Sequence, residues 1–368
     1  MLAKYYRFLV AIAPRNDKTM ISMKLVIFAG GIGTRLWPLS RQNSPKQFDQ
    51  IFSGKSTLEL AIERVAPVFG IENIFIQTTK NFKNIIKEQI SDLSKNNLIV
   101  EPARRNLGPA VCLSVLELKK RGFKGAMAIL WADHLMDKPQ QFNQALQAGK
   151  QLIEKNPDRF IFLAEQPRFA NNNLGWIKVG EKIGEQEGIA YFSFQGWKYK
   201  PMQEECEQMF KSGKYFWNPG YFITSIEFLL KQYYELAPEI YQHVSQGNYE
   251  QAEAIHFDRA IIEKVDLSKA IVIKTNMSWS DPGTLYALKE ALEDNKQANV
   301  IQGEVTTLNT TDSLVYNLEK DKLVTTVGLQ GMVVVNTQDA LVVVPKEEVV
   351  NITNLVKKLK EEGKEKYL

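Results

Sequence analysis

The order of apolar and polar positions predicts strands and helices in turn over most of the chain. Longer stretches repeat apolar residues at helical spacing, and in one of them Ser56 and Glu59 have the spacing of a capping box. Shorter runs rich in β-branched and aromatic residues, each ending in polar residues or in Gly or Pro, are typical of strands. Strand and helix in alternation predict an α/β fold of right-handed βαβ units, with a mostly parallel sheet covered on both faces. The strand-like runs are "KLVIFAG", "NIFIQTT", "NLIVEP", "AMAILWADH" and "RFIFLAE", and the helical ones are "STLELAIERVAPV", "GPAVCLSVLELKKRG" and "QFNQALQAGKQLIEKN".

The pattern changes after "TLYALKEALEDNKQANV". From Ile301 onward the chain is rich in Val, Thr and Gly with frequent turn signals, and no long helical period returns before "EEVVNITNLVKKLKEEGKEKYL". This predicts a small β domain closed by a helix. The expected organisation is an N-terminal tail (residues 1–22), a large α/β domain (23–295) and a C-terminal β domain with its closing helix (296–368).

Length and composition fit this division. A chain of 368 residues exceeds most single domains. The apolar run Phe8 to Ala13 is shorter than the core of a signal peptide and far shorter than a membrane span. Because Met23 directly precedes the first predicted strand, we expect translation to begin there naturally.

Charge and cysteine content narrow the range of partners. The chain has 46 basic and 42 acidic residues without a basic block, which argues against a nucleic-acid partner, so a bound anion needs a local site. The two cysteines, Cys112 and Cys206, form neither a disulfide framework nor a CxxC motif. We expect two core thiols, a cytoplasmic location, no structural zinc and no membrane partner.

The stretch "FAGGIGTRLWPLSRQNSPKQF", Phe28 to Phe48, is the first candidate for chemistry. The dinucleotide fingerprint GxGxxG would need a glycine at Leu36. A Walker A loop in "DQIFSGKST" would need its first glycine at Asp49, and that segment follows no strand, so we interpret its Gly-Lys-Ser end as a chance match.

The remaining interpretation is a glycine turn at the carboxyl end of the first strand, where open parallel sheets bind ligands. Gly30, Gly31 and Gly33 let backbone N–H groups approach phosphate oxygens, and Arg35 and Lys46 add cations. This combination suits a nucleoside triphosphate that loses pyrophosphate. The simpler alternative is a tight turn with surface cations.

The stretch resembles the signature of the sugar-phosphate nucleotidyltransferases, and most closely that of the mannose-1-phosphate guanylyltransferase family. The resemblance runs from about Lys24 to Leu288 and continues weakly through "GMVVVNTQDALVVV". Five further blocks follow in the order of that family. They are "EPARRNLGPA", with Leu107 in place of the usual threonine, "WADH", "FWNPGYF", "WSDPGTLYAL" and this weak C-terminal block.

The resemblance implies a Rossmann-like domain followed by a short left-handed β-helix. It also implies a reaction in which an aldose 1-phosphate attacks the α-phosphorus of GTP and releases pyrophosphate, with Mg²⁺ as cofactor. The resemblance makes Asp133 and Asp281 the expected Mg²⁺ ligands. It also implies that Arg35 binds the triphosphate and Lys46 the α-phosphate. These four are the candidate catalytic residues. The candidate nucleotide-binding residues are Ala29, Gly30, Gly31, Gly33, Thr34, Arg35, Glu101, Pro102, Asn106 and Asp133.

Two polar residues in these blocks have competing interpretations. Glu101 is expected to accept hydrogen bonds from N1 and N2 of guanine, and its alternative is a solvated strand end. His134 follows Asp133, but a phosphate oxygen needs no general base near neutral pH, so we expect His134 to have a structural role.

The sugar side departs from the family pattern. "NNNLGWIKVG" stands where TGYGYI is usual, and "WKYKP" puts Tyr199 where a sugar-binding glutamate is expected. We expect mannose 1-phosphate as substrate, with another hexose 1-phosphate as the alternative. The candidate sugar-binding residues are Gly175, Tyr199, Lys200 and Asn218.

Two further classes of protein stay open as alternatives. A catalytically silent homologue would bind a nucleotide sugar and regulate a partner, but the presence of Arg35, Lys46, Asp133 and Asp281 argues against it. A dinucleotide-dependent oxidoreductase lacks its glycine at Leu36. The sequence leaves both a monomer and a homodimer open.

Overall fold

The computed structural model describes residues 23–31, 33–41, 45–49 and 54–368, so the expected tail lies outside the described residues. These residues form two compact units, neither of which is one continuous segment. Of the described residues, the first contains 23–30, Ala61–Ala132 and Met136–Trp279, and the second contains those within Gly31–Leu60, Asp133–Leu135 and Ser280–Leu368. The domain bounds expected from the sequence, 23–295 and 296–368, stay a prediction.

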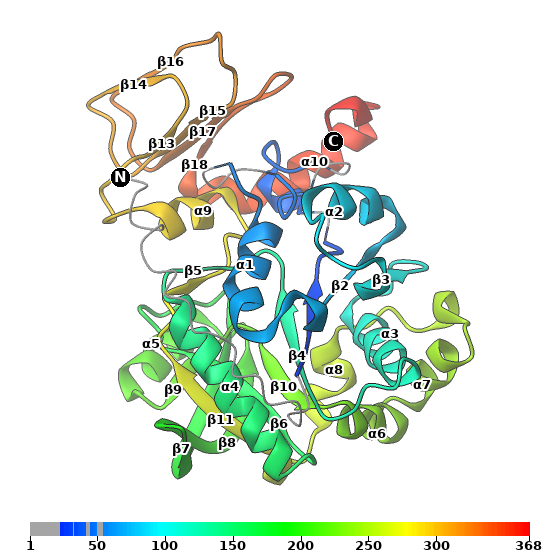
Figure 1. Cartoon of the computed structure of the whole chain (residues 1–368). Helices are drawn as coiled ribbons and strands as arrows, with labels where there is room; N and C mark the ends of the chain where they lie inside the picture. The colour runs from blue at the N-terminus through cyan, green and yellow to red at the C-terminus, as the bar shows by residue number, and fades with distance from the viewer. Residues whose placement is uncertain (1–22, 32, 42–44, 50–53) are drawn as a thin grey trace. The chain divides into compact units, whose positions relative to one another are not determined.

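The first unit is built on a ten-stranded sheet in the order β11-β8-β7-β9-β6-β10-β4-β1-β2-β3 (Figure 1). The pairs β1–β2, β1–β4, β2–β3 and β6–β11 are parallel. β10 lies between β4 and β6 and runs antiparallel to both. β8, β9 and β10 run opposite to all the other strands of the sheet. Most strands therefore share one direction, and the α/β fold with its mostly parallel sheet is confirmed. The strands are β1 (Lys24–Phe28), β2 (Ile74–Thr79), β3 (Leu98–Glu101), β4 (Ala126–Trp131), β6 (Phe160–Glu165), β7 (Gly175–Gln186), β8 (Ile189–Tyr199), β9 (Tyr215–Asn218), β10 (Phe222–Ser225) and β11 (Ala270–Thr275).

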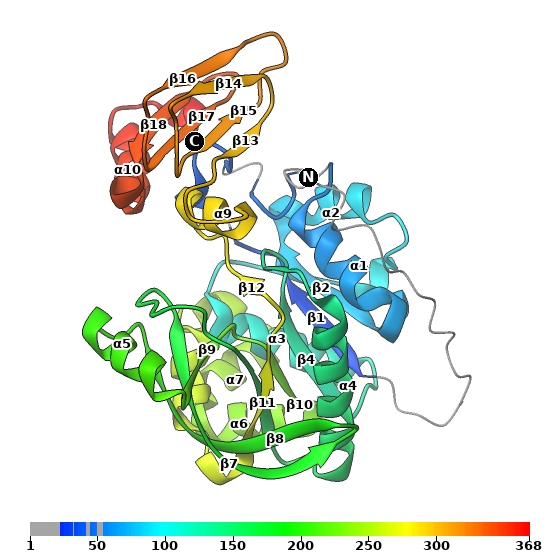
Figure 2. The same ribbon diagram turned by 90° about the vertical axis from the view of Figure 1, so that its left-hand side faces the viewer.

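The antiparallel hairpin of β7 and β8 is a feature that the strand-like runs did not predict (Figure 2). Its turn is the dipeptide Glu187-Gly188, whose φ angles are 51° and 77°. Two successive residues with positive φ are typical of the type I′ turn that joins two antiparallel strands. The pairing has register shifts between Ile177 and Gly184. Side chains in this hairpin are largely half-buried or exposed, so it lacks the long apolar runs that mark the buried strands.

Helices cover both faces of this sheet (Figures 1 and 2). Phe222 and Ile223 follow each other on β10 and therefore point to opposite faces. Phe222 packs against Phe257 of α8, whereas Ile223 lies against Gly149 of α4. The helices are α2 (Lys83–Gln89), α3 (Leu107–Lys120), α4 (Pro139–Lys155), α5 (Gln203–Ser212), α6 (Ile226–Leu236), α7 (Pro238–Ser245) and α8 (Phe257–Ala260).

Two local predictions from the sequence are confirmed in the structure. The backbone N–H of Ser56 donates to Glu59 Oε2 (2.7 Å), and the N–H of Glu59 donates to Ser56 Oγ (3.2 Å), which is a reciprocal capping box at the start of α1 (Thr57–Phe69). Cys112 and Cys206 are buried free thiols.

Among the helices in the described part of the chain, none is both long and apolar enough to cross a membrane.

The second unit contains the small β domain. β13, β15 and β17 pair in parallel, β14 pairs in parallel with β16, and β18 closes the larger sheet by running antiparallel to β17. Parallel strands stacked over short turns are typical of a β-helix, as expected. Its strands are β13 (Val300–Gln302), β14 (Val305–Leu308), β15 (Leu314–Asn317), β16 (Val324–Val327), β17 (Met332–Asn336) and β18 (Leu341–Pro345). The chain also forms β5 (Leu135–Met136), β12 (Trp279–Ser280), α9 (Leu285–Leu292) and the closing helix α10 (Ile352–Glu361).

The glycine-rich stretch contributes its apolar residues to the core of this second unit. Leu36 and Leu39 pack with Leu285 and Leu288 of α9 and with the inward side chains of β15 and β17. Trp37 joins a smaller cluster with Val342 and Ile352. The apolar positions in "RLWPL" are therefore buried, which fixes the backbone between Arg35 and Ser40.

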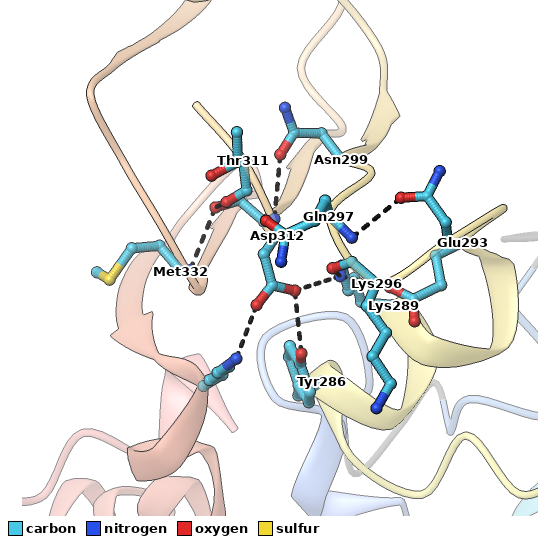
Figure 3. Close-up of polar contacts among 12 residues, drawn as sticks. Tyr286, Lys289, Glu293, Lys296, Gln297, Asn299, Thr311, Asp312 and Met332 are labelled. Carbon is cyan, nitrogen blue, oxygen red and sulfur yellow. Dashed lines mark hydrogen bonds and ion pairs between the residues drawn. The ribbon is translucent and has the colours of Figure 1, made fainter. Parts of the chain in front are cut away.

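A buried ionic cluster joins α9 to the β domain, and Figure 3 shows the Asp312 carboxylate at its centre. Lys289 Nζ donates to Asp312 Oδ1, to Glu293 Oε2 and to the carbonyl oxygen of Lys296 (3.0 Å). Asp312 also accepts from the hydroxyl of Tyr286 (3.0 Å) and from the Nζ of Lys346 (2.7 Å). The Lys289 side chain is fully buried. Burial alone would raise the pKa of Asp312, but the hydrogen bonds from Lys289, Lys346 and Tyr286 lower it.

We expect Asp312→Asn to destabilise the β domain, because it removes the charge that faces a buried ammonium. Asn fits the same volume and tolerates the local φ of 51°, so backbone strain does not contribute. The expected cost is about 3 kcal/mol in the free energy of opening, measured by hydrogen exchange of the β15 and β17 amides. Asp321→Asn, at an exposed position, is the matched control. Equal exchange rates in the two variants would show that the cluster does not stabilise the domain.

Candidate active site

Lys46 lies between the two aspartates that the sequence pairs as metal ligands. Its Nζ is 2.8 Å from Asp133 Oδ2 and 3.6 Å from Asp281 Oδ1. The Lys46 side chain is buried, while about a third of each carboxylate side chain is exposed. Three candidate catalytic residues from distant parts of the sequence therefore meet within the second unit.

The charges in this cluster shift each other's pKa. Burial alone would lower the pKa of Lys46, but the negative charges of Asp133 and Asp281 raise it. Burial alone would raise the pKa of Asp133, but the positive charges of Lys46 and His134 lower it to about 2. Lys46 is therefore charged and Asp133 is ionised at neutral pH. The charge of Arg35 acts to lower the pKa of Lys46, so Arg35 contributes to the same electrostatic field.

Short-range contacts fix Lys46 and Gln47 in place within the second unit. The backbone N–H of Lys46 donates to Ser40 Oγ (3.1 Å), and Gln47 Nε2 donates to the carbonyl oxygen of Gly31 (2.7 Å). Gly33 has a φ of 66°, and a Cβ there would lie 2.7 Å from Ser40 Oγ, so this position requires glycine. Thr34 begins the short helix that follows, and Arg35 within it is exposed. The sequence did not predict the roles of Ser40 and Gln47.

Residues near the C-terminal end of the chain bind Trp37 and Arg41. Trp37 Nε1 donates to the carbonyl oxygen of Tyr367 (2.7 Å), and Arg41 Nη1 donates to that same oxygen. Arg41 Nη2 also pairs with Asp339 Oδ1 at 2.6 Å. These contacts connect Trp37 and Arg41 to the turn between β17 and β18 and to Tyr367, and no sequence pattern indicated them.

The residues of this cluster fit a Mg²⁺ ion that completes its coordination with substrate oxygens. Asp133 and Asp281 supply two carboxylates that converge on one cation, the Lys46 ammonium. Within the described residues, no group of three or more His, Cys, Asp or Glu side chains is placed to hold a metal. Mg²⁺ in phosphate-transfer sites is commonly bound by one or two carboxylates together with phosphates and water. His134 is buried, with its Nε2 4.0 Å from Asp133 Oδ1, consistent with the expected structural role.

The first unit contains the candidates for base recognition. Glu101 is buried at the end of β3 and accepts hydrogen bonds from Gln77 Nε2 (3.3 Å) and from the hydroxyl of Tyr249 (3.2 Å). A Cβ at Gly30 would lie 3.5 Å from Glu101 Oε1, so the glycine backbone runs beside the carboxylate. Ala29 is fixed through its carbonyl oxygen, which accepts from Thr78 Oγ1 (2.9 Å). The alternative of a solvated strand end does not fit this buried carboxylate.

Two other candidate nucleotide-binding residues, Pro102 and Asn106, differ in their surroundings. Pro102 is exposed directly after Glu101. Asn106 has a positive φ of 59°, and its Nδ2 donates to the carbonyl oxygen of Ala254 (3.1 Å). In the structure this Asn106 amide therefore holds a neighbouring segment, a contact that its place in the "EPARRNLGPA" block did not predict.

The sugar candidates come together on neighbouring strands of the first unit. Gly175 on β7 pairs with Tyr199 on β8 and with Asn218 on β9, so these residues share one face of the sheet. The ring of Trp197 lies 3.3 Å from the place of a Gly175 Cβ, and the sequence did not single it out. The Tyr199 side chain is 59% exposed, which leaves its hydroxyl accessible. Lys200 follows with its Nζ 5.5 Å from the centre of the Tyr199 ring.

Known protein families and relatives match this chain over most of its length. A family model described as nucleotidyl transferase matches residues 24–298, and one described as a MannoseP isomerase/GMP-like beta-helix domain matches residues 303–359. A protein of Escherichia coli O157:H7 named mannose-1-phosphate guanylyltransferase 2 is 27% identical over an alignment of 366 residues, and the match covers 93% of this chain and 74% of the relative. Mannose-1-phosphate guanylyltransferase of Klebsiella pneumoniae is 28% identical over 360 residues, covering 93% of this chain and 75% of the relative.

A solved structure supports the same assignment. It is described as mannose-1-phosphate geranyltransferase from Thermus thermophilus, and it is 27% identical to this chain with a TM-score of 0.82. The match covers 93% of this chain and 100% of that one. Because the nucleotidyl transferase model spans most of the sequence, this chain belongs to the nucleotidyl transferase family of enzymes and has a MannoseP isomerase/GMP-like β-helix domain at its C-terminal side.

Proposed function

We propose that the chain transfers a guanylyl group from GTP to α-D-mannose 1-phosphate and so forms GDP-mannose and pyrophosphate. The observation that carries this proposal is the convergence of the Lys46 ammonium with the carboxylates of Asp133 and Asp281. The names of the relatives described above support the choice of mannose 1-phosphate and of GTP. In this reaction a phosphate oxygen of the sugar attacks the α-phosphorus, and the bond from that phosphorus to the bridging oxygen of pyrophosphate breaks.

The charged cluster supplies the phosphate chemistry in this proposal. Lys46 stays protonated and donates a hydrogen bond to the α-phosphate as negative charge moves onto the leaving pyrophosphate. Arg35, exposed on the loop, binds the triphosphate. Asp133 and Asp281 would hold Mg²⁺, which when bound neutralises charge on the phosphates. No side chain is needed as a general base, because the sugar phosphate is already ionised near neutral pH.

Guanine recognition rests on Glu101 in the proposal. A carboxylate accepts hydrogen bonds from the N1–H and N2–H groups of guanine, whereas adenine offers no such pair of donors at the corresponding edge. Burial makes this contact more selective, because a buried acceptor left without its donors costs free energy. Ala29, Gly30, Gly31, Gly33, Thr34 and Pro102 complete the proposed nucleotide-binding residues.

Sugar recognition involves Gly175, Tyr199, Lys200 and Asn218 in the proposal. Tyr199 offers one hydroxyl in place of a carboxylate that would accept two hydrogen bonds from sugar hydroxyls. The half-buried ring of Trp197 adds an apolar surface of the kind on which sugar rings stack. With fewer fixed acceptors, we expect looser selection between hexoses.

We expect Tyr199→Glu to sharpen the choice of mannose 1-phosphate over glucose 1-phosphate by about ten- to a hundred-fold. The ratio of kcat/KM for the two sugar phosphates measures this effect. Tyr215→Glu on β9, which β7 separates from β8 in the sheet, is a control for the added charge. An unmodified protein that already rejects glucose 1-phosphate as strongly as Tyr199→Glu does would remove Tyr199 from sugar selection.

The proposal is tested by a matrix of nucleoside triphosphates against sugar 1-phosphates, with pyrophosphate release as the readout. The highest kcat/KM is expected for GTP with mannose 1-phosphate. A higher value with a different hexose 1-phosphate would favour the alternative substrate. No release with any pair would favour a regulatory protein that binds nucleotide sugars.

The proposed location of the protein is the cytoplasm, with neither nucleic acid nor membrane as partner. The proposed assembly is a homodimer, which light scattering would check.

A further inference from the structure

A segment outside all the motifs lies against the "EPARRNLG" block in the first unit. This segment is Tyr249–Ile255, and it begins with the short helix η6 (Tyr249–Gln251). Tyr249 is 2% exposed, and its hydroxyl donates to Glu101 Oε2 at 3.2 Å. A tyrosine hydroxyl far away in the sequence is thus a direct partner of the carboxylate proposed to bind guanine.

Several hydrogen bonds fix the segment on that block. Arg105 Nε and Nη2 donate to the carbonyl oxygen of Glu250 at 2.9 and 2.5 Å. Asn106 Nδ2 donates to the carbonyl oxygen of Ala254. The backbone N–H of Gly108 donates to the carbonyl oxygen of Ile255 (2.8 Å). Because these bonds are spread along the whole segment, Tyr249 is held in one place relative to Glu101.

A second donor fixes the other oxygen of the same carboxylate. Gln77 Nε2 donates to Glu101 Oε1 (3.3 Å) and to the carbonyl oxygen of Ala110 (2.8 Å). The Oε1 of Gln77 in turn accepts from the hydroxyl of Ser114, so the Gln77 amide cannot rotate freely. Each carboxylate oxygen of Glu101 therefore has one fixed donor and keeps acceptor capacity for one more.

We infer that Tyr249 is a positioning residue for guanine recognition: its hydroxyl orients the Glu101 carboxylate toward the N1–H and N2–H groups of the base. The inference rests on the proposed function, since it takes Glu101 as the acceptor for guanine. Tyr249 itself does not touch the nucleotide. Its contribution is to remove the orientational freedom that a buried glutamate would otherwise lose on binding.

The ionisation of Glu101 provides a second readout for this role. Burial raises the pKa of Glu101, while the hydrogen bonds from Gln77 and Tyr249 and the charge of Arg104 lower it. Among the described residues, Tyr249 on η6 and Arg104 in the block itself are the titratable or charged groups that face this carboxylate. Only the ionised form accepts with both oxygens, so guanine binding weakens as pH falls through the Glu101 pKa. Loss of the Tyr249 hydroxyl raises that pKa further, which moves the weakening to higher pH.

The test is Tyr249→Phe, which removes the hydroxyl and keeps the ring. We expect the Kd for GTP, measured by calorimetry, to rise about tenfold while the Kd for ATP stays unchanged. Turnover at saturating GTP should stay within about twofold, because positioning of the base precedes the chemical step. The pH below which GTP binding weakens should move upward relative to the unmodified protein. Since the GTP and ATP constants come from one preparation, a partly unfolded sample leaves their ratio unaffected.

Tyr233→Phe is the matched control. The Tyr233 hydroxyl is buried and donates to the carbonyl oxygen of Gly108 (2.6 Å), so this variant loses a comparable bond near the same block without touching Glu101. Its ratio of GTP to ATP affinity should equal that of the unmodified protein. If Glu101→Gln loses the preference for GTP and Tyr249→Phe retains it, the role of Tyr249 is wrong and that of Glu101 stands. If both variants retain the preference, guanine recognition by Glu101 is wrong and the inference fails with it.

Discussion

Replacing Asp281 by asparagine should lower kcat by about 10²- to 10³-fold, because one anionic ligand for Mg²⁺ becomes a neutral amide. Asn has the same size as Asp, and Lys46 keeps its closer partner Asp133 at 2.8 Å, so the fold should persist. The loss should be larger at limiting than at saturating Mg²⁺. Steady-state kinetics over a range of Mg²⁺ concentrations, together with the thermal midpoint of the variant, separate a lost ligand from a lost fold.

The matched control for this variant is Asp294→Asn, an exposed aspartate shortly after α9. Its kinetics and its dependence on Mg²⁺ should equal those of the unmodified protein. Normal turnover of Asp281→Asn at limiting Mg²⁺ would exclude Asp281 from the metal site.

Lys46→Met should have an effect of similar size on turnover, for an electrostatic reason. Methionine fits the buried volume of Lys46 but removes the charge that faces Asp133 and Asp281. In the transition state this buried cation no longer stabilises the charge moving onto pyrophosphate, and kcat should fall by about 10²- to 10³-fold with a smaller change in the KM for GTP. Initial rates of pyrophosphate release measure both constants.

Lys55→Met is the comparison that separates two placements of the phosphate site. Lys55 belongs to the Gly-Lys-Ser sequence just before α1 and is half-buried. Near-normal kinetics are expected, since a working Walker A loop is not the basis of the proposed site. A crippled Lys55→Met beside an active Lys46→Met would contradict the assignment of Lys46.

Much of the first unit could be predicted because its central strands are buried on both faces. β1, for example, is buried at all its positions, and its sequence after Lys24 is an uninterrupted apolar run. The β7 and β8 hairpin escaped prediction because its half-exposed strands alternate irregularly and contain register shifts. Its Glu187-Gly188 turn was the available signal, and a dipeptide of that kind predicts a hairpin only when the flanking strands are already suspected.

The candidate site shows a similar division between local and long-range information. Lys46 could be singled out as a cation of the glycine-rich stretch, whereas Asp133 and Asp281 were singled out only through resemblance. No periodicity relates residues so far apart in the chain. Tyr249 and Gln77 lie in no motif, and only the folded chain brings them to Glu101. Lys289 is a further case, since a lysine on a helix is normally expected at the surface, yet this one is fully buried beside Asp312.

Guanylyl transfer is measured most directly by following the α-phosphorus and the γ-phosphorus of GTP separately. The protein is incubated with Mg²⁺, mannose 1-phosphate and GTP labelled with ³²P either at the α-phosphorus or at the γ-phosphorus. We expect the α label to appear in GDP-mannose and the γ label in pyrophosphate, at equal rates that fall together in Lys46→Met. Release of the γ label as orthophosphate, or its transfer to the sugar, would rule out guanylyl transfer.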